Sequence, residues 1–119
     1  MAKINYIDLF SGCGGISEGL EQSGKFSHTA SVEWDKRCCE TIKNRLAKKW
    51  GYNNVDHSVI EYDIQKTREI LLGSKGNEKY PKTLGLKKIL SRKKIGLTFV
   101  VKYGILSVMH WKEGILLLK

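Results

Sequence analysis

The sequence contains little proline and little cysteine. It has one proline, Pro81, and three cysteines, Cys13, Cys38 and Cys39. An odd number of cysteines, two of them adjacent, is a poor basis for a disulfide framework, so we expect structural thiols and a cytoplasmic location. No apolar run approaches the roughly 18 residues that span a bilayer. The N-terminus runs directly into a strand-like segment, so we expect no signal peptide and no membrane partner.

Metal ligation is also not indicated. The three histidines, His28, His57 and His110, show no spacing typical of metal ligands. A chain of 119 residues, 41% hydrophobic and 28% charged, is typical of one globular domain with a modest core. We therefore look for function in a binding loop and not in a metal centre.

Acidic residues are scarce in one part of the chain only. Residues 1–73 hold ten Lys/Arg and ten Asp/Glu, whereas residues 74–119 hold eleven and two, so the whole net charge of +9 lies in the second part. A basic excess favours a polyanionic partner such as DNA. A solvated basic tail would give the same composition, and no groove-reading motif accompanies the lysines. Both interpretations stay open.

A glycine-rich turn organises the first part of the chain. Residues 6–9 form an apolar run that contains Asp8, residues 12–15 hold three glycines, and a helical pattern begins near Ile16. Strand, glycine turn and helix form the first unit of a nucleotide-type site in an open α/β sheet. Glycine lets the backbone approach a ligand closely, and the helix start presents free N–H groups to it. A purely structural turn would use similar residues.

A second strand–helix unit follows. The alternation in residues 27–33 predicts a short strand that ends at Glu33, and Asp35 is a good N-cap for the next helix. Gly51 can end that helix in the left-handed conformation. The apolar positions expected to face the core are Cys38, Ile42, Leu46 and Trp50.

The exact residues of the glycine turn narrow the interpretation. The string from Asp8 to Gly15, Asp-Leu-Phe-Ser-Gly-Cys-Gly-Gly, resembles the first motif of the DNA cytosine methyltransferases that modify carbon 5. This resemblance implies a site for S-adenosylmethionine, with DNA as the substrate and a bacterial restriction-modification system as the setting. The residues that it assigns to the cofactor from this motif are Phe10, Ser11, Gly12, Cys13, Gly14 and Gly15, with Phe10 near adenine and the glycines near the methionine end.

Two further pairs complete the expected cofactor site. A carboxylate after the second strand can accept hydrogen bonds from both ribose hydroxyls, and Glu33-Trp34 resembles the family's second motif, in which the next residue packs on adenine. Asp63-Ile64 follows a strand predicted over residues 57–62, where the family has an acid that binds the adenine amino group and an apolar residue over the ring. The alternatives are a helix-start carboxylate at Glu33 and an N-cap at Asp63.

The second part of the chain, residues 74–119, does not follow the family pattern. It begins with a polar linker, continues with a helix-like segment over residues 84–92, and has a plausible fourth strand at 95–101. Residues 103–119 are apolar but show no assignable period. We therefore divide the chain into residues 1–73, the N-terminal half of a methyltransferase catalytic domain, and residues 74–119, a basic, atypical tail.

Catalytic residues of the family are missing from this sequence. Family members add a cysteine thiolate from a Pro-Cys-Gln loop to cytosine carbon 6, after flipping the base out of the duplex. Here Lys102-Tyr103-Gly104 follows the fourth strand, and no cysteine lies beyond Cys39. We thus expect no catalytic residue and no methyl transfer by this chain alone. A truncated or frameshifted gene, one piece of a split enzyme with a complementary subunit, or an engineered piece would each explain this.

The expected fold is a partial doubly wound, Rossmann-like parallel sheet of the S-adenosylmethionine-dependent methyltransferase type, with three or four strands. Two rival functions are weighed against the methyltransferase. A nicotinamide-dependent Rossmann enzyme would have Gly-x-Gly-x-x-Gly, and Ser17 stands where the third glycine belongs. A non-catalytic basic DNA-binding or interaction module would rest on residues 74–119.

Overall fold

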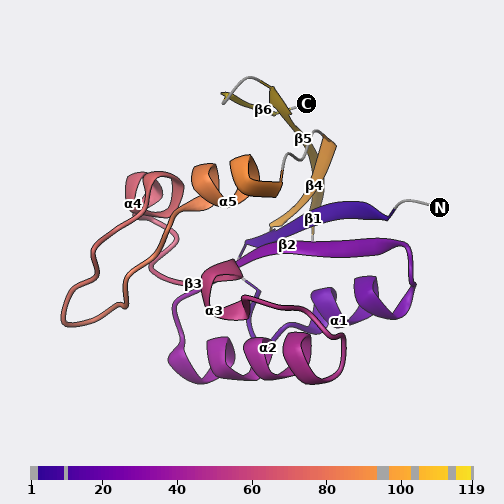
Figure 1. Cartoon of the computed structure of the whole chain (residues 1–119), viewed down its shortest axis with the longest axis horizontal. Helices are drawn as coiled ribbons and strands as arrows, with labels where there is room; N and C mark the ends of the chain where they lie inside the picture. Colours follow the sequence, from indigo (N-terminus) through magenta and orange to yellow (C-terminus); the bar gives the residue numbers. More distant parts are fainter. Residues whose placement is uncertain (1–2, 10, 94–96, 103–104, 113–114, 119) are drawn as a thin grey trace.

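The computed structural model of the chain contains six strands and five helices among the residues that it describes, namely 3–9, 11–93, 97–102, 105–112 and 115–118 (Figure 1). Side chains are described through residue 92. The elements are β1 (Ile4–Leu9), α1 (Gly15–Gln22), β2 (Phe26–Glu33), α2 (Lys36–Lys48), α3 (Val55–Ser58), β3 (Val59–Glu61), α4 (Thr67–Leu72), α5 (Leu86–Lys93), β4 (Leu97–Lys102), β5 (Ile105–Lys112) and β6 (Ile115–Leu118).

The six strands form one mixed sheet in the order β3-β2-β1-β4-β5-β6. Strands β1 to β4 are parallel, while β5 pairs antiparallel with β4 and β6 antiparallel with β5. The expected three or four parallel strands are β1 to β4, and the antiparallel strands β5 and β6 lie in residues 103–119, which show no assignable period in the sequence. An antiparallel pair needs only a short connection, and β4 and β5 are separated by only two residues in the sequence. The third strand starts later than expected, because residues 55–58 form helix α3.

The order of the parallel strands sets where a ligand can bind. From β1 the chain passes outward to β2 and β3, and then returns across the sheet to β4 on the other side of β1. Figure 1 shows the consequence, with α1 and α2 on one face of the sheet and α4 and α5 on the other. In open α/β sheets, ligands bind outside the carboxyl ends of such strands. Those ends belong to the segments after Leu9, Glu33 and Glu61.

Side chains alternate between the two helical layers, as the pleat of a strand requires. On the α5 side, Ile7, Val32 and Ile60 share one buried cluster with the α5 residues Leu86, Ile89 and Leu90. On the α2 side, Val59 packs against Cys39, Ile42 and Leu46. The expected α2 core face is correct for Ile42 and Leu46 and wrong for Cys38. Cys39 is the residue that fits the spacing of three and then four toward the sheet.

One irregularity interrupts the pairing of β1 with β2. Tyr6 pairs with His28, but its neighbour Ile7 pairs with Ala30, so Thr29 is an extra residue in β2. Thr29 is completely buried, and its hydroxyl is one of two buried side-chain polar atoms without a hydrogen-bond partner in the part of the chain with described side chains. An extra residue of this kind is a β-bulge, which re-aims the side chains that follow it.

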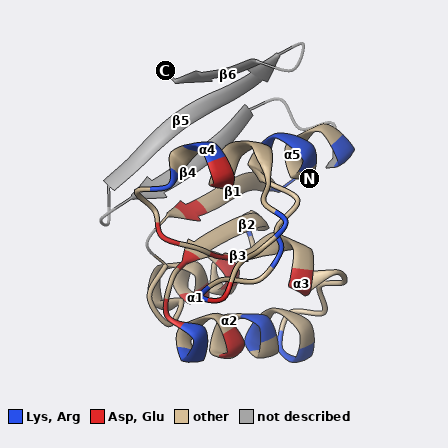
Figure 2. Ribbon diagram, turned by 90° about the vertical axis from the view of Figure 1, so that its left-hand side faces the viewer, with Lys and Arg blue, Asp and Glu red and all other residues tan. Residues whose placement is uncertain are grey.

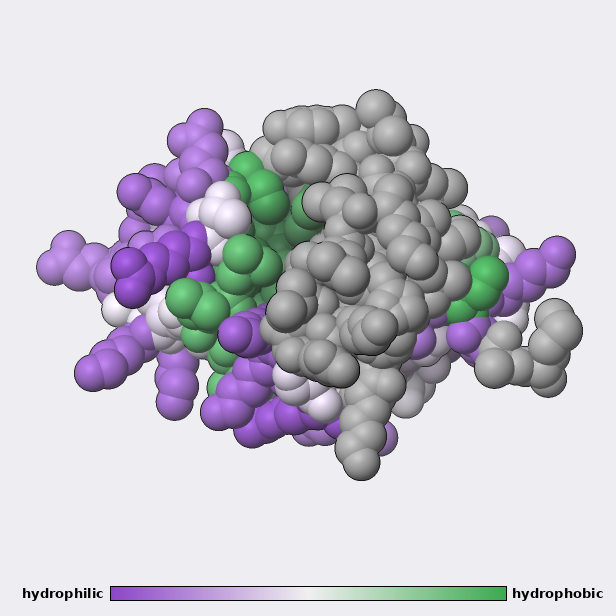
Figure 3. Space-filling view, turned by 90° about the horizontal axis from the view of Figure 1, so that it is seen from above, coloured by the Kyte–Doolittle hydropathy of each residue, from purple (hydrophilic) through white to green (hydrophobic). Residues whose placement is uncertain are grey.

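The segment between α4 and α5 folds back over the end of β3. Ser74 and Thr83 form a two-residue bridge, and the Tyr80 ring stacks on Tyr62 with the centroids 4.8 Å apart. In the ribbon of Figure 2, both α2 and α5 contain positions coloured as Lys or Arg. On the face in Figure 3, hydrophobic residues form a patch that hydrophilic residues border. Helices on both faces of the sheet contain Lys and Arg.

Candidate functional site

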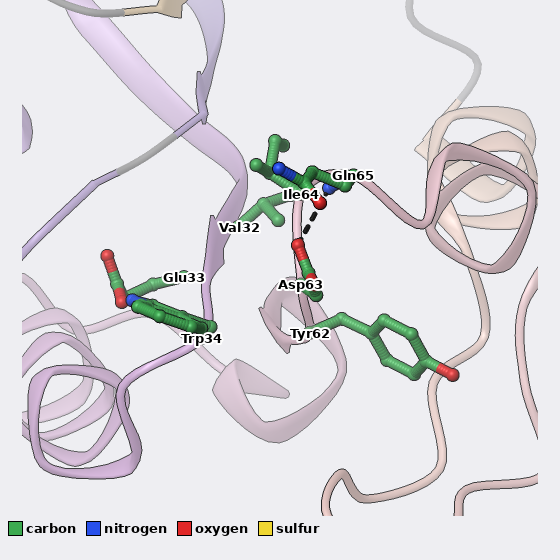
Figure 4. A pocket seen from close by; sticks show the side chains of 7 residues that line it. All are labelled: Val32, Glu33, Trp34, Tyr62, Asp63, Ile64 and Gln65. Atoms are coloured by element: carbon green, nitrogen blue, oxygen red, sulfur yellow. Dashed lines mark hydrogen bonds between the residues drawn. The ribbon is translucent and has the colours of Figure 1, made fainter.

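A cavity of about 340 Å³ opens at the carboxyl ends of β2 and β3. Its volume lies at the lower end of the range of about 300–1,000 Å³ that is usual for small-molecule sites. Figure 4 shows Glu33 and Trp34 on one side of it and Asp63 and Ile64 on the other, while the Tyr62 ring points away. The lining residues are Val32, Glu33, Trp34, Tyr62, Asp63, Ile64 and Gln65.

Glu33 joins this cavity to the glycine loop. Its side chain is only 8% exposed, and its Oε1 accepts a hydrogen bond from the Gly12 amide at 3.1 Å. Its Oε2 accepts from the Asp35 amide at 2.7 Å, so the carboxylate also steadies the start of α2 as the alternative interpretation expected. A carboxylate has about four acceptor positions, so each oxygen of Glu33 can accept a further hydrogen bond.

The glycine loop is shaped by backbone conformations that suit glycine. Gly12 and Gly14 have φ values of 56° and 86°, in the left-handed region. A Cβ on Gly14 would lie 3.3 Å from Ile42 Cγ1 of α2, so the loop packs closely on that helix. Gly14 is the N-cap of α1 and Gly15 its first residue, and no side chain caps this helix start. The start of α1 therefore has a backbone cap and no side-chain cap.

Two buried hydroxyls anchor the loop to the sheet. Ser11 Oγ donates to the Val32 carbonyl at 3.3 Å, and Ser17 Oγ of α1 donates to Asp8 Oδ2 at 2.7 Å. Asp8 is buried, and burial raises the pKa of its carboxyl above the usual value, while the Ser17 bond opposes that rise. The nearby Glu33 charge raises the Asp8 pKa further. The buried Asp8 carboxylate therefore links the end of β1 to the start of α1.

Trp34 and Asp63 are more open to solvent than Glu33. The Trp34 side chain is 61% exposed, and Lys79 Nζ lies 6.0 Å from its ring centroid. Asp63 Oδ1 accepts from the Gln65 amide at 2.9 Å, which leaves its second oxygen without a described bond (Figure 4). The N-cap of α4 is Lys66, so Asp63 is not the cap that the alternative interpretation expected. Ile64 packs against the core cluster on the α5 side.

The remaining expected site residues fall outside the cavity lining. Phe10 lies outside the described residues. Cys13 points to α2, where it forms a disulfide with Cys38, with the two Cα atoms 4.4 Å apart. This corrects the expectation of three unpaired structural cysteines. The odd number of cysteines argued against a disulfide, but two of the three are paired and the third, Cys39, is a buried free thiol.

Sequence reasoning missed three residues that shape the site. Arg45 of α2 donates through Nη1 to the carbonyls of Cys13 and Gly14, at 3.2 and 3.4 Å, and so holds the loop from outside. Val32 and Gln65 line the cavity. Val32 and Gln65 could have been predicted, because each is adjacent in sequence to an expected site residue, Glu33 or Ile64. Arg45 lies thirty residues beyond the loop, and no sequence pattern connects it to the site.

Two features do not occur in the part of the chain that the structure describes. No group of three or more His, Cys, Asp and Glu side chains is disposed to hold a metal ion there. Within the same residues, no helix has the length and apolar character needed to cross a bilayer.

Comparison with known proteins matches the first part of the chain. The family model for C-5 cytosine-specific DNA methylase matches residues 4–75. Type II methyltransferase M1.HphI of Haemophilus parahaemolyticus is 38% identical over 62 residues, which is 52% of this chain and 14% of that protein.

Two other type II methyltransferases are similar, one over a shorter and one over a longer stretch. M.Bpa9945I of Bacillus paralicheniformis is 55% identical over 40 residues, 34% of this chain and 9% of that protein. M.AquIA of Picosynechococcus sp. is 40% identical over 73 residues, 60% of this chain and 26% of that protein. The chain therefore spans about a quarter or less of the curated relatives that it matches. Since the family model covers more than half of the 119 residues, the chain belongs to the C-5 cytosine-specific DNA methylase family.

Proposed function

We propose that residues 4–75 bind the adenosine part of S-adenosylmethionine, within an enzyme that methylates carbon 5 of cytosine in DNA. The observation that carries this proposal is the cavity that Glu33, Trp34, Asp63 and Ile64 line together. These four residues come from two strand ends that are about thirty residues apart in sequence. The family membership of the same stretch supports the assignment independently.

The chemistry of the lining fits the two halves of adenosine. Vicinal ribose hydroxyls need an acceptor with several lone pairs, and the Glu33 carboxylate has acceptor positions beyond those that the Gly12 and Asp35 amides use. The adenine ring needs apolar surfaces on its faces and an acceptor at its amino group. Trp34 and Ile64 provide the surfaces, and the second oxygen of Asp63 provides the acceptor.

The methionine end of the ligand would then lie against the glycine loop. Gly12 and Gly14 permit a close approach of backbone N–H groups, and the Glu33–Gly12 hydrogen bond fixes the loop relative to the ribose acceptor. The bound cofactor supplies an activated methyl group. Phe10 and Cys13, assigned to the same site by sequence, stay part of the proposal.

Methyl transfer itself is proposed to need residues that these 119 do not hold. Carbon 5 of cytosine becomes a nucleophile only after a thiolate adds to carbon 6. The cysteines of this sequence are Cys13 and Cys38, which pair with each other, and Cys39, which is buried under β2. We infer that a further polypeptide segment or a complementary subunit carries the nucleophile and the DNA-recognition region. The setting would be a restriction-modification system, in line with the type II names of the relatives.

Calorimetry with the purified chain tests cofactor binding. S-adenosylhomocysteine should bind, and NAD should not, because the loop lacks the third glycine of a dinucleotide site. Asp63→Ala should weaken S-adenosylhomocysteine binding by about tenfold, the usual effect of losing one hydrogen bond to a charged group. Glu61→Ala is the matched control, since it removes a carboxylate from the end of the same strand but outside the cavity. Binding of NAD with no binding of S-adenosylhomocysteine would contradict the proposal.

A transfer assay tests the rest. With labelled S-adenosylmethionine and duplex DNA of mixed sequence, the chain alone should incorporate no methyl group. Methylation of cytosine by the purified chain would overturn the inferred need for a complementary segment, while leaving the cofactor site intact.

DNA binding by the basic second part of the chain is a second candidate function. Residues 74–119 carry eleven Lys/Arg against two Asp/Glu. If these charges bind phosphates, DNA binding by the chain should weaken steeply with salt, in proportion to the number of phosphates neutralised. A salt-independent affinity, or none in dilute salt, would leave this part as a solvated basic tail.

A further inference from the structure

Cys13 and Cys38 join two parts of the chain that lie 25 residues apart in sequence. Cys13 belongs to the glycine loop, and Cys38 to the first turn of α2. Their Cα atoms are 4.4 Å apart, at the short end of the range that a disulfide spans without backbone movement. The bond therefore connects the loop at the end of β1 directly to the helix that follows β2.

The pair is accessible to reagents, and the third cysteine is not. Cys13 is exposed and Cys38 is partly exposed, whereas Cys39 is completely buried. The Cys39 thiol donates to the Glu33 carbonyl at 3.2 Å, and burial raises its pKa to about 12. Only the thiolate takes part in thiol–disulfide exchange, so Cys39 stays a spectator thiol while Cys13 and Cys38 can react.

The disulfide adds a covalent restraint to a loop that is otherwise held by hydrogen bonds and packing. Gly12 and Gly14 give the backbone wide conformational freedom. Arg45 holds the loop from α2 through two carbonyls, and Glu33 holds it through the Gly12 amide. A covalent bond to Cys38 removes conformations that these hydrogen bonds alone permit. The state of the two sulfurs thus decides how firmly the loop is fixed.

We propose that Cys13 and Cys38 form a reversible dithiol–disulfide site that locks the glycine loop against α2. The oxidant is a small-molecule disulfide. One thiolate attacks it to give a mixed disulfide and release one thiol, and the second thiolate then displaces the other half. Two thiols of the protein become one disulfide, and the two electrons and two protons end on two small thiols. Excess small thiol reverses both steps.

The first experiment establishes the chemistry. The purified chain is equilibrated with mixtures of reduced and oxidised glutathione, then denatured and alkylated, and its peptides are mapped by mass. We expect three alkylated cysteines under reducing conditions and one, Cys39, under oxidising conditions. Cys39→Ser should still form the 13–38 bond. In Cys13→Ser the remaining cysteines should not pair with each other. Failure of the unaltered chain to form this bond at any ratio overturns the proposal.

The second experiment measures the lock. Amide hydrogen exchange across residues 11–17 should slow by about tenfold or more on oxidation, while exchange in α5, on the opposite face of the sheet from α2, stays within about twofold. In Cys13→Ser, oxidant should change neither. Cys38→Ser is the second variant, should Cys13→Ser not fold. Equal exchange in the two redox states of the unaltered chain would overturn the locking role.

A parallel titration with S-adenosylhomocysteine keeps this inference separate from the proposed function, on which only the titration rests. A locked loop should bind this ligand more tightly than a free one, because less freedom is lost on binding. Binding by neither state contradicts the proposed function and leaves the exchange result standing. Slower exchange on oxidation with unchanged affinity would place the lock away from the ligand and contradict its link to the cofactor site.

Discussion

Two buried carboxylates on the same face of the sheet, Glu21 and Glu33, have opposite surroundings. Glu21, at the end of α1, accepts from the Tyr6 hydroxyl at 3.3 Å and from the Tyr52 hydroxyl at 2.5 Å. The Tyr52 oxygen also accepts from the His28 amide at 2.8 Å. The Glu21 carboxylate is therefore held by two tyrosine side chains, one of which is itself hydrogen-bonded to β2. Glu33 accepts only from backbone amides and borders a cavity.

The hydrogen-bond partners distinguish an acid that is held by core side chains from an acid that borders a cavity. Burial does not separate the two, since both side chains are under a tenth exposed. The partners do. The donors to Glu21 are tyrosine side chains, which would lose their acceptor if Glu21 were replaced. Glu33 instead borders a cavity, where a ligand could supply further donors. Four substitutions test this difference between the two acids.

Glu21→Ala should cost the most stability. It leaves the Tyr6 and Tyr52 hydroxyls without their acceptor in a buried setting, and we expect the free energy of unfolding to fall by about 3 kcal/mol. Urea denaturation measures this. Gln22→Ala is the matched control on the same helix, where the side chain is exposed and a change within about 0.5 kcal/mol is expected. Equal losses in the two variants would contradict a structural network at Glu21.

Glu33→Gln should act mainly on ligand binding. An amide cannot accept at both ends, so affinity for S-adenosylhomocysteine should fall by about 10- to 100-fold, with about 1 kcal/mol or less lost in unfolding free energy. Glu21→Gln is the matched change in the other network, and it should leave affinity within about twofold. If the two variants lost affinity equally, the separation of structural and binding acids would fail.

Asp8→Asn should change how stability depends on pH. Because burial raises the Asp8 pKa, the folded state binds a proton more tightly there than the unfolded state does. The contribution of Asp8 to stability is therefore complete at low pH and is lost as pH rises through the raised pKa. Urea unfolding at a series of pH values should show this decline in the unaltered chain and a weaker one in Asp8→Asn. Ser17→Ala should steepen it, since the Ser17 bond lowers the Asp8 pKa.

Lys49→Ala should have the smallest effect on stability. Lys49 is largely exposed and pairs with Glu18 at the surface of α1, where ion pairs contribute little. The Glu18 pKa is lowered to about 2, with the hydrogen bond from Lys49 as the main cause. The contribution of this pair to stability is therefore complete above the usual carboxyl pKa and is lost as pH falls toward about 2. Carboxyl titration by NMR should find the Glu18 pKa raised in the variant. An unchanged Glu18 pKa would mean that Lys49 is not its main partner.

The sequence allowed good predictions where local chemistry decides the structure. The N-cap at Asp35 is confirmed, because its side chain accepts from the Arg37 and Cys38 amides, and so is the left-handed Gly51. The glycine loop after β1 and the acids after β2 and β3 lie at the ends of parallel strands, and their positions could be predicted from strand order alone. Their role in binding stays a prediction.

Other features depend on contacts that no local pattern reports. The four-residue helix α3 is too short to show a period, and β5 and β6 lie in an apolar segment where alternation cannot be read. The face that Cys38 takes depends on where Cys13 lies, and the Arg45 contact depends on how α2 packs on the loop. Such pairings follow from the tertiary arrangement.

The bulge at Thr29 links the two carboxylate networks. His28 and Glu33 are five residues apart in β2, and in a strand of strict alternation an odd spacing sends two side chains to opposite faces. The extra residue resets the phase, so that His28 reaches Tyr52 and Glu33 reaches Gly12 on one face. One extra threonine therefore lets a single strand direct both His28 and the proposed ligand-binding Glu33 toward α1 and α2, with Ala30 and Val32 buried on the opposite face.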